Sequence, residues 1–442
     1  MERDLTKGSI FKNIVFFSLP YLLSYFLQTL YGMADLFIIG QFYGVDSITA
    51  VSIGSQVMHM LTVMIVGLAM GSTVTIGQAV GAKQSRQTSR TVGNTITLFL
   101  GVSIAAMILL LVFVKPIVAL MSTPEEAFSG TVLYLTICFI GIPFITAYNI
   151  ISSIFRGLGD SKSPMYFIAA ACAANVLLDY LFIGVFHLGA AGAALGTTLA
   201  QTISVIVALY VILRRKTGIS LKKEDFRPQA GTMGQILKIG IPVALQDGFI
   251  QIAFIVITII ANRRGLNDAA AVGIVEKFIG VVFLVPSTML SAVSALAAQN
   301  IGAGKHDRAA ATLRYAIFIT VGYGLIVSVI TQFTGSGIVG MFTEDAEVTL
   351  LGEQYLRSYI WDCIFAGIHF SFSGYFCAYG LSGISFLHNV LSIVFVRVPG
   401  AVLASKYFPD TLFPMGLAAP AGSLLSVMIC AAAFVYMRKN KL

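Results

Sequence analysis

The chain has 442 residues, of which 57% are hydrophobic and only 11% are charged. A soluble globular domain is nearer half apolar and a quarter charged, so this composition excludes a water-soluble fold, a disordered chain and a disulfide scaffold. The net charge of +8 does not indicate nucleic-acid binding, because the positive residues lie in short loops between long apolar runs. That distribution is typical of membrane topology.

Long apolar runs predict twelve membrane-spanning helices in chain order. A spanning helix needs about 20 apolar residues, and in lipid only a helix satisfies the backbone polar groups of such a run. The first run follows a charged start and is too long for a signal-peptide core, so we expect it to stay as a span. The expected spans are residues 14–38, 50–78, 92–114, 131–153, 164–186, 190–212, 237–261, 271–298, 312–332, 350–375, 383–404 and 414–437.

Loop charges predict the orientation of these spans. Most Lys and Arg residues of the expected loops lie on the side of the two termini, and the opposite side carries only Lys115, Arg263, Arg264 and Lys406. Because positive loops stay in the cytoplasm, this bias places both termini there. Arg263 and Arg264 are a local exception.

The two halves of the chain resemble each other at a constant offset of 221 residues: Gln78 matches Gln299, and Tyr134 matches Tyr355. Six spans per half keep both halves in one orientation, so the repeats are parallel. We expect an all-α polytopic membrane protein whose twelve transmembrane helices form two six-helix bundles. The bundles are expected to be related by a pseudo-two-fold along the membrane normal and to face a central cleft. The expected parts are an N-lobe at 1–215, a cytoplasmic linker at 216–235 and a C-lobe at 236–442.

Ionisable residues inside membrane spans are costly and usually functional. Asn175 and Asp179 are four residues apart, so they share one face of the fifth span, and Asp35 lies in the first. This spacing suits coordination of a proton or Na⁺ by oxygen atoms. At the offset of 221, the positions of Asp35, Asn175, Asp179 and Thr197 hold Val256, Val396, Gly400 and Ala418. The polar cluster is thus specific to the first half and indicates a specialised site, with a packing hydrogen bond between helices as the open alternative.

Further polar and aromatic residues in the spans are candidates for a substrate-binding cleft. Asp247 and Gln251 share a helix face beyond Pro242, whereas Glu276 could either pair with another helix or line the cleft. The candidate cleft residues are Tyr31, Gln56, Tyr148, Phe155, Asp247, Gln251 and Glu276.

Other buried charges and prolines carry structural expectations. Asp362 and Arg357 are expected to form an internal ion pair, and Arg397 needs a partner because charges in this medium are paired. Pro20 and Pro242 lie inside the first and seventh spans, which are repeat partners. Interior proline bends a helix. The bends either belong to a conformational element or are fixed parts of the fold.

Missing motifs exclude several classes of function. The sequence holds no GxxxxGK[ST] loop, so ATP is not the energy source, and no HExxH, GxSxG or paired Cys/His spacing that would indicate a membrane enzyme. A channel would need a polar ring repeated through both halves, which the sequence lacks. The chain is therefore not expected to be an enzyme, and no organic cofactor is expected.

Several motifs together resemble those of the multidrug and toxic compound extrusion (MATE) transporters. They are SerLeuPro at 18–20, AlaAsp at 34–35, GlyGlnAlaValGlyAla at 77–82, PheArgGlyLeuGlyAspSerLysSerPro at 155–164, AsnValLeuLeuAspTyr at 175–180 and GlyAlaAlaLeuGlyThr at 192–197. The resemblance implies twelve helices in two lobes. It also implies export of organic-cation or amphipathic drugs in exchange for H⁺ or Na⁺.

The resemblance also implies where the coupling ion binds. Prokaryotic members use an N-lobe site whose residues match Asp35, Asn175, Asp179 and Thr197, which would be metal ligands if the ion is Na⁺. One branch adds a Glu on the seventh helix and an Asp on the tenth, where this chain has Gln251 and Ala366. This departure favours the branch that relies on the N-lobe. A lipid-linked precursor flippase of the same superfamily is the alternative. Such flippases have a strongly cationic cleft, whereas this sequence has few positively charged residues in its spans.

The expected surroundings follow from this reading. The partners are the lipid bilayer and small cationic or amphipathic substrates, with no nucleic acid, and a monomer is expected. The expected location is the inner membrane of a prokaryotic cell, crossed many times, with both termini cytoplasmic.

Overall fold

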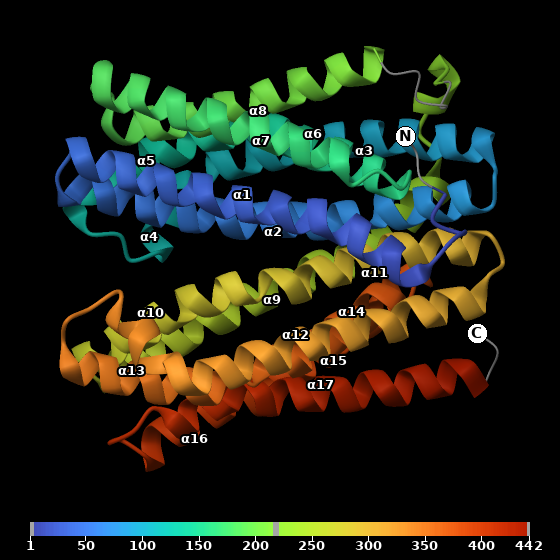
Figure 1. The fold of residues 1–442 in the computed structure, drawn as a ribbon. Coiled ribbons are helices and arrows are strands. Elements are labelled where there is room, and N and C mark those ends of the chain that lie inside the picture. The colour runs from blue at the N-terminus through green and yellow to red at the C-terminus, as the bar shows by residue number, and fades with distance from the viewer. Residues whose placement is uncertain (1–3, 215–220, 440–442) are drawn as a thin grey trace. The chain divides into compact units, whose positions relative to one another are not determined.

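The computed structural model describes residues 4–214 and 221–439, and helices account for most of them (Figure 1). The chain up to residue 240 contains α1 (Ile10–Phe42), α2 (Val45–Gly81), α3 (Ser85–Val112), α4 (Val114–Leu120), α5 (Glu125–Ile140), α6 (Ile142–Gly157), α7 (Lys162–Asp179), the π-helix η1 (Tyr180–Val185), α8 (Gly189–Arg214) and the short 3₁₀ helix η2 (Lys223–Phe226). α9 (Ala230–Arg264) then leads to α10 (Leu266–Val282), α11 (Leu284–Gly302), α12 (His306–Gly340), α13 (Ala346–Tyr359), α14 (Asp362–Ala378), α15 (Ser382–Ser392), the π-helix η3 (Ile393–Arg397), α16 (Val398–Tyr407) and α17 (Phe413–Lys439).

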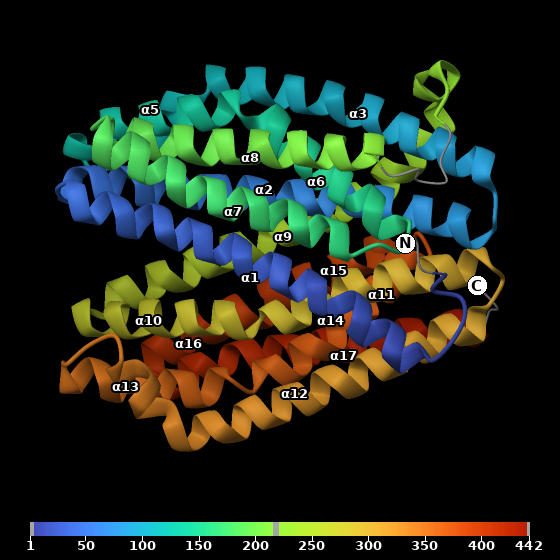
Figure 2. The same cartoon turned by 45° about the horizontal axis from the view of Figure 1, so that its top comes forward.

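These helices divide into two compact units. Val15–Gly240 makes the first unit, and Lys7–Ile14 with the chain from Ile241 onward makes the second. In the first unit α7 packs on α8, and α2 packs on α5 and α6 (Figure 2). In the second unit α14 packs on α11, α12 and α17. Of the expected linker at 216–235, residues 216–220 lie outside the described part of the chain.

The predicted fold class is confirmed, because every expected span coincides with a helix or a broken helix. Over the described residues, ten helices are long and apolar enough to cross a membrane, and the pair α5–α6, bent by 49°, makes an eleventh. The expected tenth span, residues 350–375, is the one that these eleven do not include. It corresponds to α13 and α14, where Glu347, Glu353 and Arg357 make the first segment polar.

The internal repeat appears in the packing of the two units. Thr73 Oγ1 donates to the backbone oxygen of Ser153 at 3.1 Å. In the second unit Ser294 Oγ donates to the backbone oxygen of Gly374 at 3.3 Å. Donor and acceptor are each shifted by 221 residues. The same contact between helices therefore recurs in both units, as the sequence offset predicts.

Arg264, one of the two arginines that form the local exception in loop charge, is held by contacts within the second unit. Arg264 Nε forms an ion pair with Asp268 Oδ1 at 2.8 Å, and the same side chain is only 6% exposed. Its two Nη atoms donate to the backbone oxygens of Ser405, Phe408, Pro409 and Thr411. Arg264 thus satisfies the carbonyl groups around the end of α16, so its position reflects local packing.

Candidate cation-binding site

Four polar side chains of the first unit come together inside the helix bundle. Asp35 comes from α1, Asn175 and Asp179 from the last turn and a half of α7, and Thr197 from α8. All four are buried, with exposed fractions of 2%, 1%, 0% and 9% in that order. Asp35 therefore shares one interior position with three residues that lie 140 or more positions further along the chain.

The carboxyl group of Asp35 is the centre of this cluster. Thr197 Oγ1 donates a hydrogen bond to Asp35 Oδ2 at 2.9 Å. Asp179 and Asn175 lie close enough to interact with the same carboxyl group. The two carboxyl groups are thus held next to each other, with a hydroxyl group and an amide beside them.

A small residue on α8 makes room for Asp179. A Cβ atom built on Gly196 would overlap Oδ1 of Asp179 and would lie 3.1 Å from its Cγ. Asp179 is also the last residue of α7, and the π-helix η1 begins at Tyr180. π-helical turns inside longer helices often mark functional sites. The neighbouring Gly196 and the change of helix type together position the buried carboxyl group.

The cluster leaves many polar atoms without a hydrogen bond. Among the described residues, Asp35 Oδ1, both side-chain atoms of Asn175 and both carboxyl oxygens of Asp179 have no partner. Buried polar groups are normally satisfied, and two adjacent buried carboxylates repel each other. The cluster therefore fits a bound cation or proton, since it offers carboxylate, amide and hydroxyl oxygens, the ligands that hard cations prefer.

A second layer of polar groups surrounds the site. Gln201 Nε2 donates to the hydroxyl oxygen of Tyr31 at 3.3 Å, and Gln201 Oε1 is buried without a partner in the described structure. Tyr31 in turn lies within electrostatic reach of Asp35. Sequence reasoning missed Gln201, although it follows Thr197 by four residues and so shares its helix face.

The structure brings three of the candidate cleft residues together. Tyr31 lies beside the Asp35 carboxyl group and also packs against the apolar cluster that contains Tyr148 and Phe155, whereas Gln56 is exposed on α2. Tyr148 and Phe155 are buried in an apolar cluster of the first unit with Phe167, whose ring centroid is 5.5 Å from that of Phe155. Three candidates belong to the second unit and are half-buried: Asp247 and Gln251 on α9 and Glu276 on α10.

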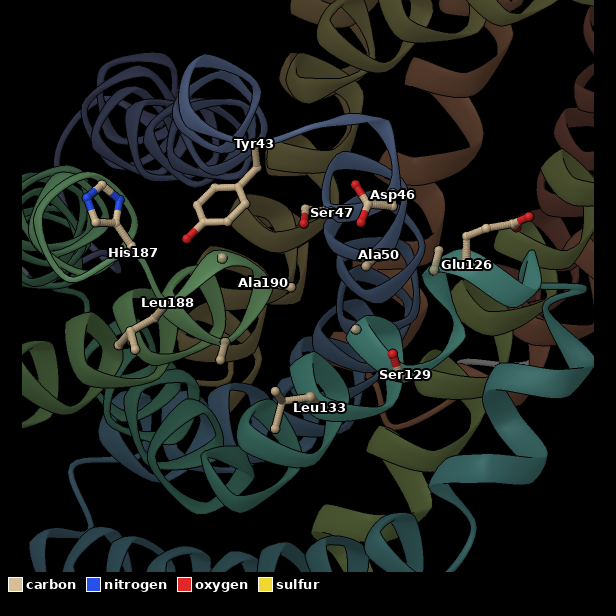
Figure 3. A pocket seen from close by; sticks show the side chains of 14 residues that line it. Tyr43, Asp46, Ser47, Ala50, Glu126, Ser129, Leu133, His187, Leu188 and Ala190 are labelled. Carbon is tan, nitrogen blue, oxygen red and sulfur yellow. The ribbon is translucent and has the colours of Figure 1, made fainter.

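A pocket of about 290 Å³ lies at one end of the first unit. Tyr43, Asp46, Glu126 and His187 line it together with small residues such as Ala190 (Figure 3). Tyr43 follows Asp35 by eight residues and Ala190 precedes Thr197 by seven, which corresponds to roughly 10–12 Å along a helix. Measured along the helix axes, the candidate site thus lies about two helical turns from this pocket.

Comparisons with known proteins identify relatives along the whole chain. The family model MatE matches twice, at residues 20–181 and again at residues 242–403. The starts of the two matches are 222 residues apart, next to the offset of 221 in the sequence. The chain is 29% identical over 439 residues to the probable multidrug resistance protein YpnP of Bacillus subtilis, covering 99% of this chain and 97% of the relative. It is 26% identical to the probable multidrug resistance protein YoeA of the same organism, with 99% and 96% covered.

Solved structures share the fold. A multidrug resistance MATE family transporter of the MOP superfamily, in an outward-facing conformation, superimposes with a TM-score of 0.91 at 21% sequence identity. The alignment covers 98% of each chain.

Proposed function

Because the chain belongs to the MATE family of multi-pass membrane transporters, we propose that it exports organic-cation or amphipathic drugs in exchange for H⁺ or Na⁺. The names of two relatives, probable multidrug resistance proteins, support the class of substrate. Export by alternating access in a prokaryotic cell membrane, with cytoplasmic termini, is part of the proposal. The coupling ion takes the place of any cofactor, and the transporter works as a monomer.

One observation carries the proposed coupling: in the buried cluster of Asp35, Asn175 and Asp179, five polar side-chain atoms lack a hydrogen-bond partner among the described residues, and three of them are carboxyl oxygens. Taking two negative charges into an apolar bundle is costly, so the empty cluster is less stable than the cluster with a bound cation or proton. Binding would draw α1 and α7 together by removing the repulsion between their carboxyl groups. Asn175 and Thr197 would supply neutral oxygen ligands.

Tyr31 connects this site to the proposed substrate contacts. Its hydroxyl group accepts a hydrogen bond from Gln201 and lies near Asp35, while its ring offers a face to an organic cation. An ion that moves Asp35 would therefore also move Tyr31, since both belong to α1. By linkage, substrate would then weaken ion binding by the same factor by which the ion weakens substrate binding. The other proposed contacts are Gln56, Tyr148, Phe155, Asp247, Gln251 and Glu276.

Transport in reconstituted vesicles tests the proposal. Purified protein is placed in liposomes, and a Na⁺ gradient or a pH gradient is imposed separately while uptake of a fluorescent organic cation is followed. We expect one of the two gradients to drive uphill transport in the wild-type protein and to fail with Asp179→Asn. Glu344→Gln, which changes an exposed carboxyl group in the second unit, is the matched control and should transport normally.

The same assay separates the alternatives. If Asp179→Asn is driven as well as the wild-type protein at equal insertion, the coupling assignment is wrong. If no organic cation is moved and only phosphate-bearing lipid precursors cross the membrane, the flippase reading replaces the drug-export proposal.

A further inference from the structure

The second unit contains its own cluster of buried charges. Arg397, at the end of η3, is 8% exposed, and Asp362, at the start of α14, is 1% exposed. The guanidinium group of Arg397 attracts the carboxyl group of Asp362, and it also attracts that of Glu276 on α10. Arg357 takes no part in this cluster, because it pairs with Glu353 at 2.8 Å. The ion pair expected between Arg357 and Asp362 is therefore wrong, and the neighbour of Asp362 is Arg397.

The guanidinium group of Arg397 is fixed by packing. Its Nη2 donates to the hydroxyl group of Tyr359, and its Cζ lies 5.0 Å from the ring centroid of Phe254 and 5.6 Å from that of Tyr359. A Cβ on Gly422 of α17 would lie 3.2 Å from the Cβ of Arg397. These contacts hold the positive charge of Arg397 in one position.

The cluster lacks one positive charge. Both carboxyl oxygens of Asp362 and Oε1 of Glu276 are buried without a geometrically formed hydrogen bond among the described residues, and the one polar neighbour of Asp362 besides Arg397 is the neutral hydroxyl group of Ser423. Two carboxylates and one guanidinium give a net charge of −1, and a net charge inside a membrane bundle is costly. Lys277 is exposed, on a different face of α10 from Glu276, so it does not supply the missing charge. The other ionisable side chains that face these groups are Tyr355, Tyr359, Cys363 and His369.

None of these four neighbours supplies the charge. Tyrosine and cysteine are neutral or negative. His369 lies against His388, with ring centroids 5.4 Å apart, and it also faces Arg397. A positive charge on His369 would be repelled by the guanidinium group and is further disfavoured by burial. The missing charge therefore has to come from outside the cluster.

Thr258 of α9 suits a protonated Glu276. Its Oγ1 lies 3.0 Å from the backbone oxygen of Phe254 and 3.2 Å from Oε2 of Glu276. A hydroxyl group has one hydrogen to donate but can also accept. With a carboxylate at Glu276, only one of the two contacts is a hydrogen bond. With a protonated Glu276, Thr258 accepts from the acid and donates to the carbonyl oxygen, so both contacts are satisfied.

The repeat shows that this acid is not needed for the fold. At the offset of 221, Glu276 and Tyr355 correspond to Ser55 and Tyr134. Ser55 Oγ and the hydroxyl group of Tyr134 are hydrogen-bonded at 3.1 Å. The first unit thus packs the same pair of positions with a neutral hydroxyl group. A structural role needs no charge at this position, so the carboxyl group of Glu276 is specific to the second unit.

From these contacts we infer that Glu276 is a second proton-binding group, which holds one exchangeable proton while Arg397 serves as the permanent counter-ion of Asp362. The reaction is the reversible protonation of one carboxylate oxygen, and no other bond changes. Glu276 is the exchanging group because it is half-buried, whereas Asp362 is fully buried. This inference does not depend on the coupling role proposed for Asp35 and Asp179.

Infrared difference spectroscopy of the purified protein tests the inference. Protonated carboxyl groups have a C=O stretch that carboxylates lack. The parent for the experiment carries Asp35→Asn and Asp179→Asn, so that the first unit contributes no carboxyl signal from its cluster. We expect the additional change Glu276→Gln to remove one protonated-carboxyl band at neutral pH. Glu353→Gln is the matched control, because Glu353 forms an ion pair with Arg357 at 2.8 Å and lies outside the cluster. It should leave the spectrum unchanged.

Two further variants locate the proton. Thr258→Val removes the neighbouring hydroxyl group and should shift the frequency of the Glu276 band without deleting it. Arg397→Lys keeps a positive charge beside Asp362, so the spectrum should still show the single protonated-carboxyl band of Glu276. Arg397→Gln removes the counter-ion of Asp362, so a second protonated-carboxyl band, from Asp362, should appear.

Two results would overturn the inference. Identical spectra of the parent and its Glu276→Gln derivative over the whole pH range would show that Glu276 stays ionised beside Arg397. Loss of the band in Asp362→Asn, with the band retained in Glu276→Gln, would move the proton to Asp362. Because the parent already lacks both first-unit carboxyl groups, neither result bears on the proposed coupling.

Discussion

Gly196 of α8 lies directly against the carboxyl group of Asp179 on α7, so closely that a Cβ atom at residue 196 would overlap Oδ1. The two helices pack tightly, and Asp179 is fully buried. The absence of a side chain at residue 196 is therefore what allows a carboxyl group to face Asp35 at this point. The contact leads to a first prediction.

Gly196→Ala should disrupt the proposed cation site without preventing insertion. The added methyl group has to push α8 away from α7 or turn the Asp179 side chain, and overpacking of this kind costs typically 1–3 kcal/mol. We expect a lower melting temperature in detergent and a loss of ion-driven transport. Gly101→Ala on α3 is the matched control, because a Cβ there meets nothing within 4 Å. Equal behaviour of the two variants would show that the Gly196 contact does not limit the site.

Thr197→Val should weaken ion binding. Thr197 Oγ1 donates to Asp35 Oδ2 and is also a candidate ligand, and a hydrogen bond to a charged group is worth about 1.5–3 kcal/mol. We expect roughly a tenfold or greater loss of ion affinity, at 1.4 kcal/mol per factor of ten. Ion-induced changes in melting temperature would measure it.

The control for this variant lies on the same helix. Thr202 Oγ1 donates to the backbone oxygen of Thr198 within α8, so Thr202→Val makes the same chemical change without touching a carboxyl group. Unchanged ion affinity in Thr197→Val, relative to Thr202→Val, would remove Thr197 from the site.

Much of the fold could be predicted from the sequence, because a long apolar run in lipid has only one way to satisfy its backbone. The breaks within spans could not be placed in this way. α5 ends and α6 begins around Gly141, and α10 ends and α11 begins around Phe283. Pro143 and Pro286 lie in the first turn after each break, where a missing N–H group costs little. The sequence shows the prolines, but a proline alone does not distinguish a break from a helix that continues through it, as α1 does at Pro20.

The candidate site shows a similar division. Asp35, Asn175, Asp179 and Thr197 could be predicted because polar side chains are rare in these spans and are absent from the matching positions of the second half. Gly196 could not, since glycine is common throughout the chain and its role depends on how closely α7 and α8 approach. The neighbour of Arg397 could not be predicted either. Asp362 lies 35 residues away, and only the packing of α14 against the segments around η3 brings the two together.

Asn94 of α3 should hold the segment that connects the two halves. Asn94 Nδ2 donates to the backbone oxygen of Asp225 at 3.1 Å, and its Oδ1 accepts from the Gln229 N–H group at 2.7 Å. Asn94→Ala leaves these buried backbone groups unpaired, at about 1–3 kcal/mol. We expect faster proteolytic cleavage between residues 221 and 229, measured by mass spectrometry of the fragments. Arg90→Ala, an exposed change one turn earlier on α3, should be cut at the wild-type rate. Equal rates for both variants would contradict a fastening role.

Pro20→Ala should uncouple the ion from the substrate. Pro20 lies inside the continuous helix α1, fifteen residues before Asp35, and Tyr31 lies between the two. Proline lacks the N–H group that would complete the helical ladder, so the bend at this point can change at modest cost. Ion binding at Asp35 would then alter the bend and, with it, the position of Tyr31. Alanine restores the missing hydrogen bond and favours one straight conformation of α1.

We therefore expect Pro20→Ala to bind an organic cation with an affinity that no longer responds to pH or Na⁺. Equilibrium binding of a fluorescent substrate at two pH values, with and without Na⁺, measures this response directly. Pro420→Ala is the matched control, because Pro420 also lies inside a helix, α17, which contributes no residue to the site in the first unit. Its substrate affinity should keep the wild-type response. If Pro20→Ala kept the response as well, the bend in α1 would be a fixed part of the fold. Ion binding would then have to reach the substrate through the contacts of Tyr31 with Gln201 and Asp35 alone.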